Sequence, residues 1–104
     1  MRRLGAGDDG GRVELRVGDE LELRLAENPT TGHRWRLVEL EPAVLEVTRD
    51  EFRPPDPSRA GAGGERVWAL AARGPGESTL RLAYARGWAG APAARTFVLT
   101  IAVR

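Results

Sequence analysis

The stretch Glu20-Leu21-Glu22-Leu23-Arg24-Leu25 alternates charged residues with leucine at every position. Successive side chains of a β-strand point to opposite faces of a sheet, so this stretch predicts a strand with one buried and one wet face. An amphipathic helix does not fit, because its apolar residues recur every three to four positions. The stretch therefore favours an antiparallel sheet with one face in water.

The same alternation recurs along the chain. It is clear at 13–17, 80–84 and 97–103, and less regular at 33–40, 45–51 and 65–72. Turn sequences rich in Gly, Pro and Asn separate these segments, and no convincing helix remains. We therefore predict an all-β, immunoglobulin-like sandwich of about seven antiparallel strands.

The length of 104 residues corresponds to one domain, which can bury a single core without metals or disulfides. There is no internal repeat. Residues 1–10 lack the alternation and are predicted to form a flexible N-terminal tail. Residues 11–104 are predicted to form the domain itself.

Composition bears on partners and location. The net charge of +1 gives no electrostatic footprint for nucleic acid or an anionic membrane. No apolar run approaches the roughly 18 residues needed to span a bilayer, and the N-terminus does not have the pattern of a signal peptide. The compartment stays open: we expect a protein that is cytoplasmic as written, or exported with its signal already removed.

The side chains needed for catalysis are scarce. Cysteine is absent, His33 is the only histidine, and Ser58 and Ser78 are the only serines. A Ser–His–acid triad would need one of these serines beside His33, yet neither lies in a nucleophile-type turn. One histidine without cysteine makes a zinc site improbable. We expect no enzyme activity, no catalytic residue, no metal site and no cofactor.

Strand direction points to one end of the sandwich. If each predicted strand reverses direction, the connections at 28–32, 54–64 and 86–90 share one end. These three carry the unusual sequences, whereas the connections at the other end are short and bland. Loops on a rigid scaffold often carry binding residues. The alternating strand direction therefore predicts one binding end made of these three loops.

The first of these loops reads Asn28-Pro29-Thr30-Thr31-Gly32. Pro29 fixes its own φ and biases Asn28 towards an extended conformation, while Gly32 can take a positive φ. The threonines can bond locally or face a partner. Taken alone, the sequence is most simply a stiff turn.

The other two loops also allow two interpretations each. Gly61-Ala62-Gly63-Gly64 can be a flexible linker or backbone that approaches a partner closely. Arg86 and Trp88 belong to the residue types most enriched at binding hot spots, although Trp88 could instead fold back over the core. Trp35 and Trp68 lie within predicted strands and are assigned to structure.

The three segments in this order resemble the chagasin family of cysteine-peptidase inhibitors, over about residues 12–104. The resemblance implies reversible, non-covalent, competitive inhibition of papain-like cysteine peptidases by a monomer, with the three loops across the active-site cleft. Thr30 and Thr31 would approach the catalytic cysteine, Gly63 and Gly64 would bring backbone alongside, and Trp88 would pack on peptidase aromatics. The implied peptidase-binding residues are Asn28, Pro29, Thr30, Thr31, Gly32, Gly61, Gly63, Gly64, Arg86 and Trp88.

Two positions depart from the family pattern. Gly87 stands where the family usually has proline, which loosens the loop and predicts weaker affinity or altered selectivity. His33 stands where an aromatic residue usually follows the first motif. Because histidine changes charge near neutrality, inhibition is predicted to depend on pH between about 5 and 8.

An alternative of a different class is an immunoglobulin-like adhesion or assembly module without a peptidase target. Such a module would use a sheet face or an edge strand rather than the loops. Titration into a papain-like peptidase with a fluorogenic substrate discriminates between the two.

Overall fold

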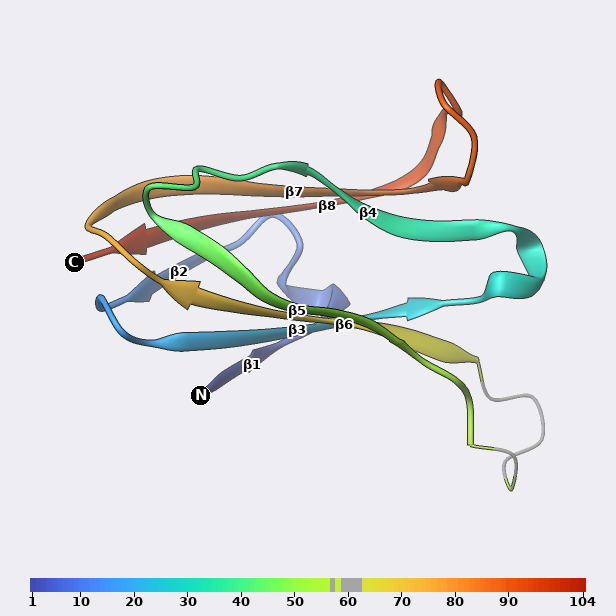
Figure 1. Ribbon diagram of the computed structural model, residues 1–104, viewed down its shortest axis with the longest axis horizontal. Coiled ribbons are helices and arrows are strands. Elements are labelled where there is room, and N and C mark those ends of the chain that lie inside the picture. The colour runs from blue at the N-terminus through green and yellow to red at the C-terminus, as the bar shows by residue number, and fades with distance from the viewer. Residues whose placement is uncertain (57, 59–62) are drawn as a thin grey trace.

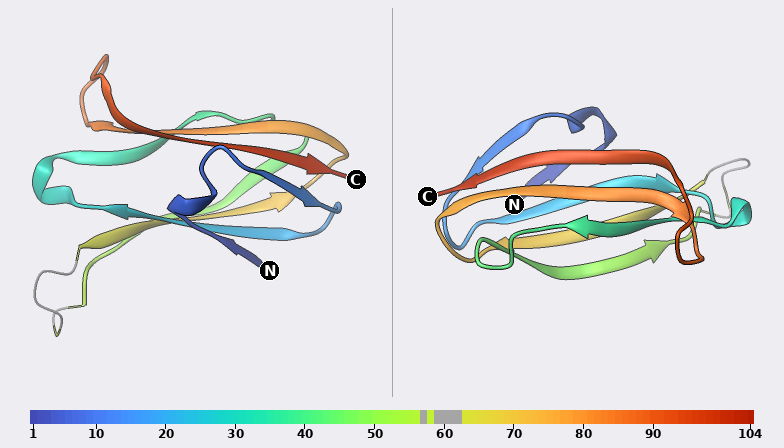
Figure 2. Two further views of the ribbon diagram at one scale, coloured as in Figure 1. Left: turned by 180° about the vertical axis from the view of Figure 1, so that it is seen from behind. Right: turned by 90° about the horizontal axis from the view of Figure 1, so that it is seen from above.

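The computed structural model describes residues 1–56, 58 and 63–104, and two four-stranded sheets pack face to face in it (Figures 1 and 2). One sheet has the order β1-β3-β6-β5, and the other the order β2-β8-β7-β4. The strands are β1 (Arg2–Leu4), β2 (Arg12–Leu15), β3 (Glu20–Glu27), β4 (His33–Glu39), β5 (Leu45–Arg53), β6 (Gly64–Ala72), β7 (Gly76–Arg86) and β8 (Ala93–Val103). Two short 3-10 helices, η1 (Ala6–Asp8) and η2 (Pro29–Thr31), complete the described elements.

The prediction of an all-β sandwich is confirmed, with eight strands instead of seven. The seven predicted strands are β2 to β8. In the part of the chain that the structure describes, no helix is long and apolar enough to cross a membrane.

The extra strand lies in residues 1–10, where the sequence predicts a flexible tail. Arg2–Leu4 instead pairs in parallel with the edge of β3, and Leu4 packs against the core. Asp9 reaches the other sheet, where its Oδ1 accepts the backbone N–H of Val98 at 2.8 Å. Three residues are too few to show a periodic pattern, so this pairing left no signal in the sequence.

The edge positions also make "immunoglobulin-like" a loose description. In antibody constant domains the first strand joins the sheet of the second, fifth and fourth strands. Here the first of the predicted strands, β2, pairs in parallel with β8 in the opposite sheet. That leaves one edge of β3 open, and β1 occupies it.

The core lies between the sheets and contains most of the residues that the alternation assigns to the inner face. Val17 and Leu37 are exceptions, because Val17 lies beyond the end of β2 and Leu37 lies at a register shift between β4 and β7, and they are 50% and 39% exposed. Leu21 and Leu23 of β3 face Leu82 and Leu99 of the other sheet's strands, and all four are fully buried. Trp35 and Trp68 also belong to the core cluster, as predicted. The packed core supports the strand ends from which the loops emerge.

One end of the sandwich lies on the right in Figure 1. There β3, β5 and β7 terminate, and β4, β6 and β8 start. This arrangement results from the antiparallel pairings, which are β3–β6, β5–β6, β4–β7 and β7–β8. The predicted gathering of three connections is therefore confirmed. We call this the loop end, and its described segments are 28–32, 54–56, 58, 63 and 87–92.

Candidate functional site

The first loop is a compact turn closed by its own side chains. Asn28 Oδ1 accepts the backbone N–H of Thr30 at 3.1 Å and its hydroxyl at 2.6 Å. The Asn28 carbonyl accepts the Thr31 backbone N–H at 3.2 Å and the Thr31 hydroxyl at 2.8 Å. Gly32 then leaves the turn at a φ of 78°, a region that favours glycine. Both threonine hydroxyls therefore hold the turn together while they remain exposed.

An aromatic cluster fixes this turn on the sheet below. The backbone N–H of Asn28 donates to the hydroxyl of Tyr84 at 3.0 Å. The Tyr84 ring lies 5.3 Å from the His33 ring and 5.0 Å from the Trp35 ring, between centroids. His33 Nδ1 lies 3.1 Å from the Thr31 hydroxyl. The tip is thus connected to β7 and β4 together.

A buried ion pair lies beneath the first and second loops. Glu27, the last residue of β3, is only 2% exposed. Its carboxylate accepts Arg66 Nε at 2.7 Å, Arg66 Nη2 at 3.3 Å and the Trp35 backbone N–H at 3.3 Å. Arg66 also donates to Asp50 at 3.1 Å. Hydrogen bonding to Glu27 is the main cause that raises the pKa of the Arg66 guanidinium.

Sequence reasoning missed this pair, although a signal for it exists. Glu27 continues the inward series of Leu21, Leu23 and Leu25, and Arg66 continues inward from Trp68. Two opposite charges at inward positions, near the same end of paired strands, indicate a buried ion pair.

The second loop is described on both sides of a gap. Asp56 Oδ1 accepts the backbone N–H of Ser58 at 2.9 Å and its hydroxyl at 2.7 Å, and the backbone hydrogen bond is the main cause that lowers the pKa of Asp56. Gly63 is exposed, with open space where a Cβ would lie. Gly61 lies outside the described residues.

Gly64 has a structural reason within the fold. It is buried at the start of β6, and an added Cβ would lie within 2.6 Å of two Phe52 ring carbons and 2.8 Å from the Arg53 carbonyl oxygen. Close approach of β5 therefore requires glycine here. Of the glycines in this segment that the structure describes, Gly63 is the one that faces solvent.

The third loop projects away from its sheet (Figures 1 and 2). The register between β7 and β8 shifts between Tyr84 and Ala85, and such bulges bend a strand. Trp88 is 57% exposed, so the interpretation of Trp88 as a lid on the core is wrong. The Arg86 guanidinium carbon lies 5.6 Å from the centre of the Trp88 ring, within cation–π range.

Gly87 lies between these two side chains. An added Cβ at Gly87 would meet no atom within 4 Å, and the residue is not among those with positive φ. Neither space nor backbone conformation requires glycine at this position. The effect of Gly87 on affinity stays a prediction.

The described site residues thus gather at one end, with the first loop between the other two in Figure 1. Exposed loops on a rigid scaffold often carry binding residues. Residues 14–101 match the family described as "Chagasin family peptidase inhibitor I42". The chain belongs to this family of peptidase inhibitors, which are not enzymes.

Individual relatives agree. The chain is 29% identical to Chagasin of Trypanosoma cruzi over 86 residues, which is 79% of this chain and 78% of that protein. The crystal structure of the cysteine protease inhibitor EhICP2 from Entamoeba histolytica superposes with a TM-score of 0.84 at 21% identity, covering 99% and 94% of the two chains. PbICP-C, solved in complex with falcipain-2, has a TM-score of 0.71 at 16% identity over the whole of both chains. The two structural likenesses concern the fold.

Proposed function

We propose that this chain is a reversible, non-covalent, competitive inhibitor of papain-like cysteine peptidases, and that its loop end occupies the active-site cleft. The observation that carries the proposal is the family match over residues 14–101. The gathering of the three family-type segments at one end supplies a surface for it. The family match makes the adhesion-module alternative unnecessary.

The first loop is suited to enter a cleft without being cleaved. Four hydrogen bonds within Asn28–Thr31 hold it as a 3-10 turn before any partner arrives. Ordering costs on binding are then low, because the bound shape already exists. A closed turn also does not offer an extended peptide to the catalytic thiolate. In this proposal Thr30 and Thr31 form the tip.

The remaining contacts flank the tip. Exposed backbone at Gly63 can approach the peptidase without a side chain in the way, and Gly61 belongs to the same segment. Gly64 acts by letting β5 approach β6 closely. Trp88, with Arg86 stacked on its ring, provides a large exposed apolar surface for the other flank.

The experiment titrates the protein into a papain-like peptidase with a fluorogenic substrate. We expect competitive inhibition that is reversed by dilution. Trp88→Ala is expected to cost about 2 kcal/mol or more, which is about 30-fold in the inhibition constant. Val38→Ala is the matched control, because Val38 is 52% exposed but lies outside the loop end.

The outcomes separate two questions. No inhibition by the unmodified protein, tested on several papain-like enzymes, would refute the function itself. Full inhibition by Trp88→Ala would leave the function in place and remove the third loop as an anchor.

A further inference from the structure

A hollow beside the third loop is lined by four arginines. Arg34 and Arg36 come from β4, Arg66 from β6 and Arg86 from β7, next to Trp88. In the cross-strand register Arg34 lies opposite Ala85 and Arg36 opposite Ala83. Of these two alanines, Ala85 also lines the hollow. Among the described residues no carboxylate lines this hollow.

The charge of the hollow is largely uncompensated. Within the described part of the chain, Arg34, Arg36 and Arg86 form no ion pair, whereas Arg66 is neutralised by Glu27 and Asp50. Two other arginines of the same sheet are paired with carboxylates. Away from the loop end, Arg81 pairs with Glu39 at 3.2 Å and Arg12 with Glu77 at 3.1 Å.

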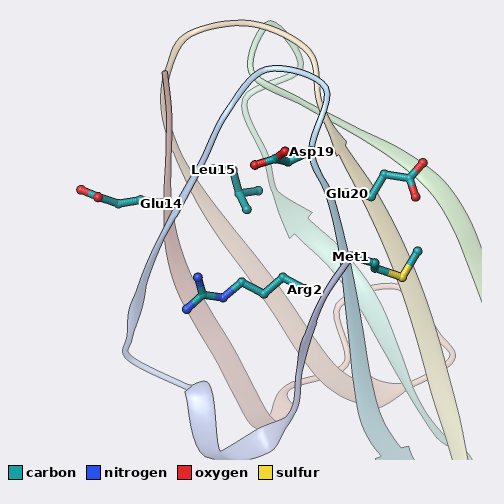
Figure 3. A pocket seen from close by; sticks show the side chains of 6 residues that line it. All are labelled: Met1, Arg2, Glu14, Leu15, Asp19 and Glu20. Atoms are coloured by element: carbon teal, nitrogen blue, oxygen red, sulfur yellow. The ribbon is translucent and has the colours of Figure 1, made fainter.

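The hollow at the opposite end of the molecule makes the contrast clear. There Arg2 lies among Glu14, Asp19 and Glu20, so that both signs of charge line one surface (Figure 3). Other hollows among the described residues also contain arginine, but carboxylates line them as well. At the loop end no carboxylate lines the hollow, and three of its four arginines have no ion pair among the described residues.

We propose that this arginine hollow, through Arg34, Arg36 and Arg86, receives carboxylate side chains from the wall of the peptidase cleft beside the contact made by Trp88, while Arg66 stays paired with Glu27 and Asp50. The inference rests on the proposed function and adds the kind of peptidase that is preferred: one with an acidic rim. Guanidinium groups bind carboxylates through paired, charge-assisted hydrogen bonds. Complementary charge raises the association rate and favours some partners over others.

A protein segment fits this surface better than a small free anion. Trp88 borders the hollow and is 57% exposed. An inorganic anion would satisfy the arginines but leave the indole in water. A peptidase wall that carries carboxylates next to apolar side chains covers both.

The test measures association and dissociation rates on one papain-like peptidase with carboxylates flanking its cleft, and on a variant of it in which these are replaced by amides. Arg34→Gln/Arg36→Gln is expected to slow association with the acidic enzyme about tenfold at low salt. The difference should vanish near 1 M salt, where charges are screened within about 3 Å. On the amide variant the same substitutions should change the rate less than twofold.

Two control variants accompany this test. Arg2→Gln/Arg16→Gln removes two charges from the hollows at the opposite end, where neither arginine has an ion pair among the described residues, and should leave both rates within twofold. Arg34→Lys/Arg36→Lys retains the charge, so association should stay fast while dissociation accelerates, because the paired geometry is lost. This variant also separates loss of charge from misfolding.

The possible results of these measurements distinguish the acidic-rim proposal from its alternatives. Equal effects of the Arg34/Arg36 and Arg2/Arg16 variants, or equal effects on both forms of the peptidase, would overturn the acidic-rim proposal while inhibition stands. Saturable sulfate binding to the free protein, without dependence on the peptidase carboxylates, would assign the hollow to a small anion instead. Failure of the unmodified protein to inhibit either form would remove the proposed function, and this inference with it.

Discussion

Replacement of Glu27 by leucine tests how the loop end is held together. The substitution removes a carboxylate that is 2% exposed and accepts two hydrogen bonds from Arg66 and one from the Trp35 backbone. Breaking a buried ion pair by removing one partner costs about 3–5 kcal/mol. Arg66 keeps Asp50 and is 17% exposed, which favours the lower end, so we expect a loss of about 3 kcal/mol.

The assay is urea unfolding followed by the fluorescence of the buried Trp35 and Trp68. A loss of about 3 kcal/mol corresponds to a fall of roughly 12–24 °C in Tm for a domain of this size. Glu39→Leu is the matched control. Its ion pair with Arg81 is about half exposed on both sides and is worth about 1 kcal/mol or less.

A double-mutant cycle refines the result. Glu27→Leu, Arg66→Leu and the double variant should show a coupling energy of about 1–3 kcal/mol, with the double variant more stable than the sum of the single losses predicts. If the free energy of unfolding of Glu27→Leu lies within 1 kcal/mol of that of the unmodified protein, the ion pair does not hold β3 and β6 together below the loops.

Three further predictions concern other parts of the chain. Gly64→Ala should cost about 1–3 kcal/mol in denaturant unfolding, because its Cβ meets the Phe52 ring and the Arg53 carbonyl, while Gly63→Ala, with open space, should be near neutral; equal effects would refute the packing argument. Hydrogen bonding to Arg24 lowers the pKa of Glu22, so the stability that Glu22 contributes is present above about pH 4.3 and lost as the pH falls through its lower folded value. The stability difference between the unmodified protein and Glu22→Gln should therefore shrink between pH 6 and pH 3, and a constant difference would contradict this. Deletion of residues 1–10 removes the β1 pairing but no loop, so residues 11–104 should fold with a lower Tm and inhibit within twofold of the full chain; loss of folding would show that the domain begins earlier.

Much of the fold follows from local pattern. The alternation in 20–25 identifies the buried face of β3, and counting strand directions places three connections at one end. Both depend on sequence neighbours, since the two faces of a strand and its direction relative to the next are set within a few residues. The segments that carry the family resemblance are equally local.

Non-local contacts decided the rest. The pairing of Arg2–Leu4 with β3 depends on an edge that is open because β2 joins the other sheet. The burial of Glu27 with Arg66, 39 positions apart, and the four arginines around one hollow come from strands that only the packed sandwich brings together. Sequence alone determined most of the inward-facing residues, Val17 and Leu37 excepted, and which loops share an end. Tertiary structure decided which charged side chains lie close together. The alternation within one strand gives the faces of that strand, but it does not give the distance to a residue on another strand.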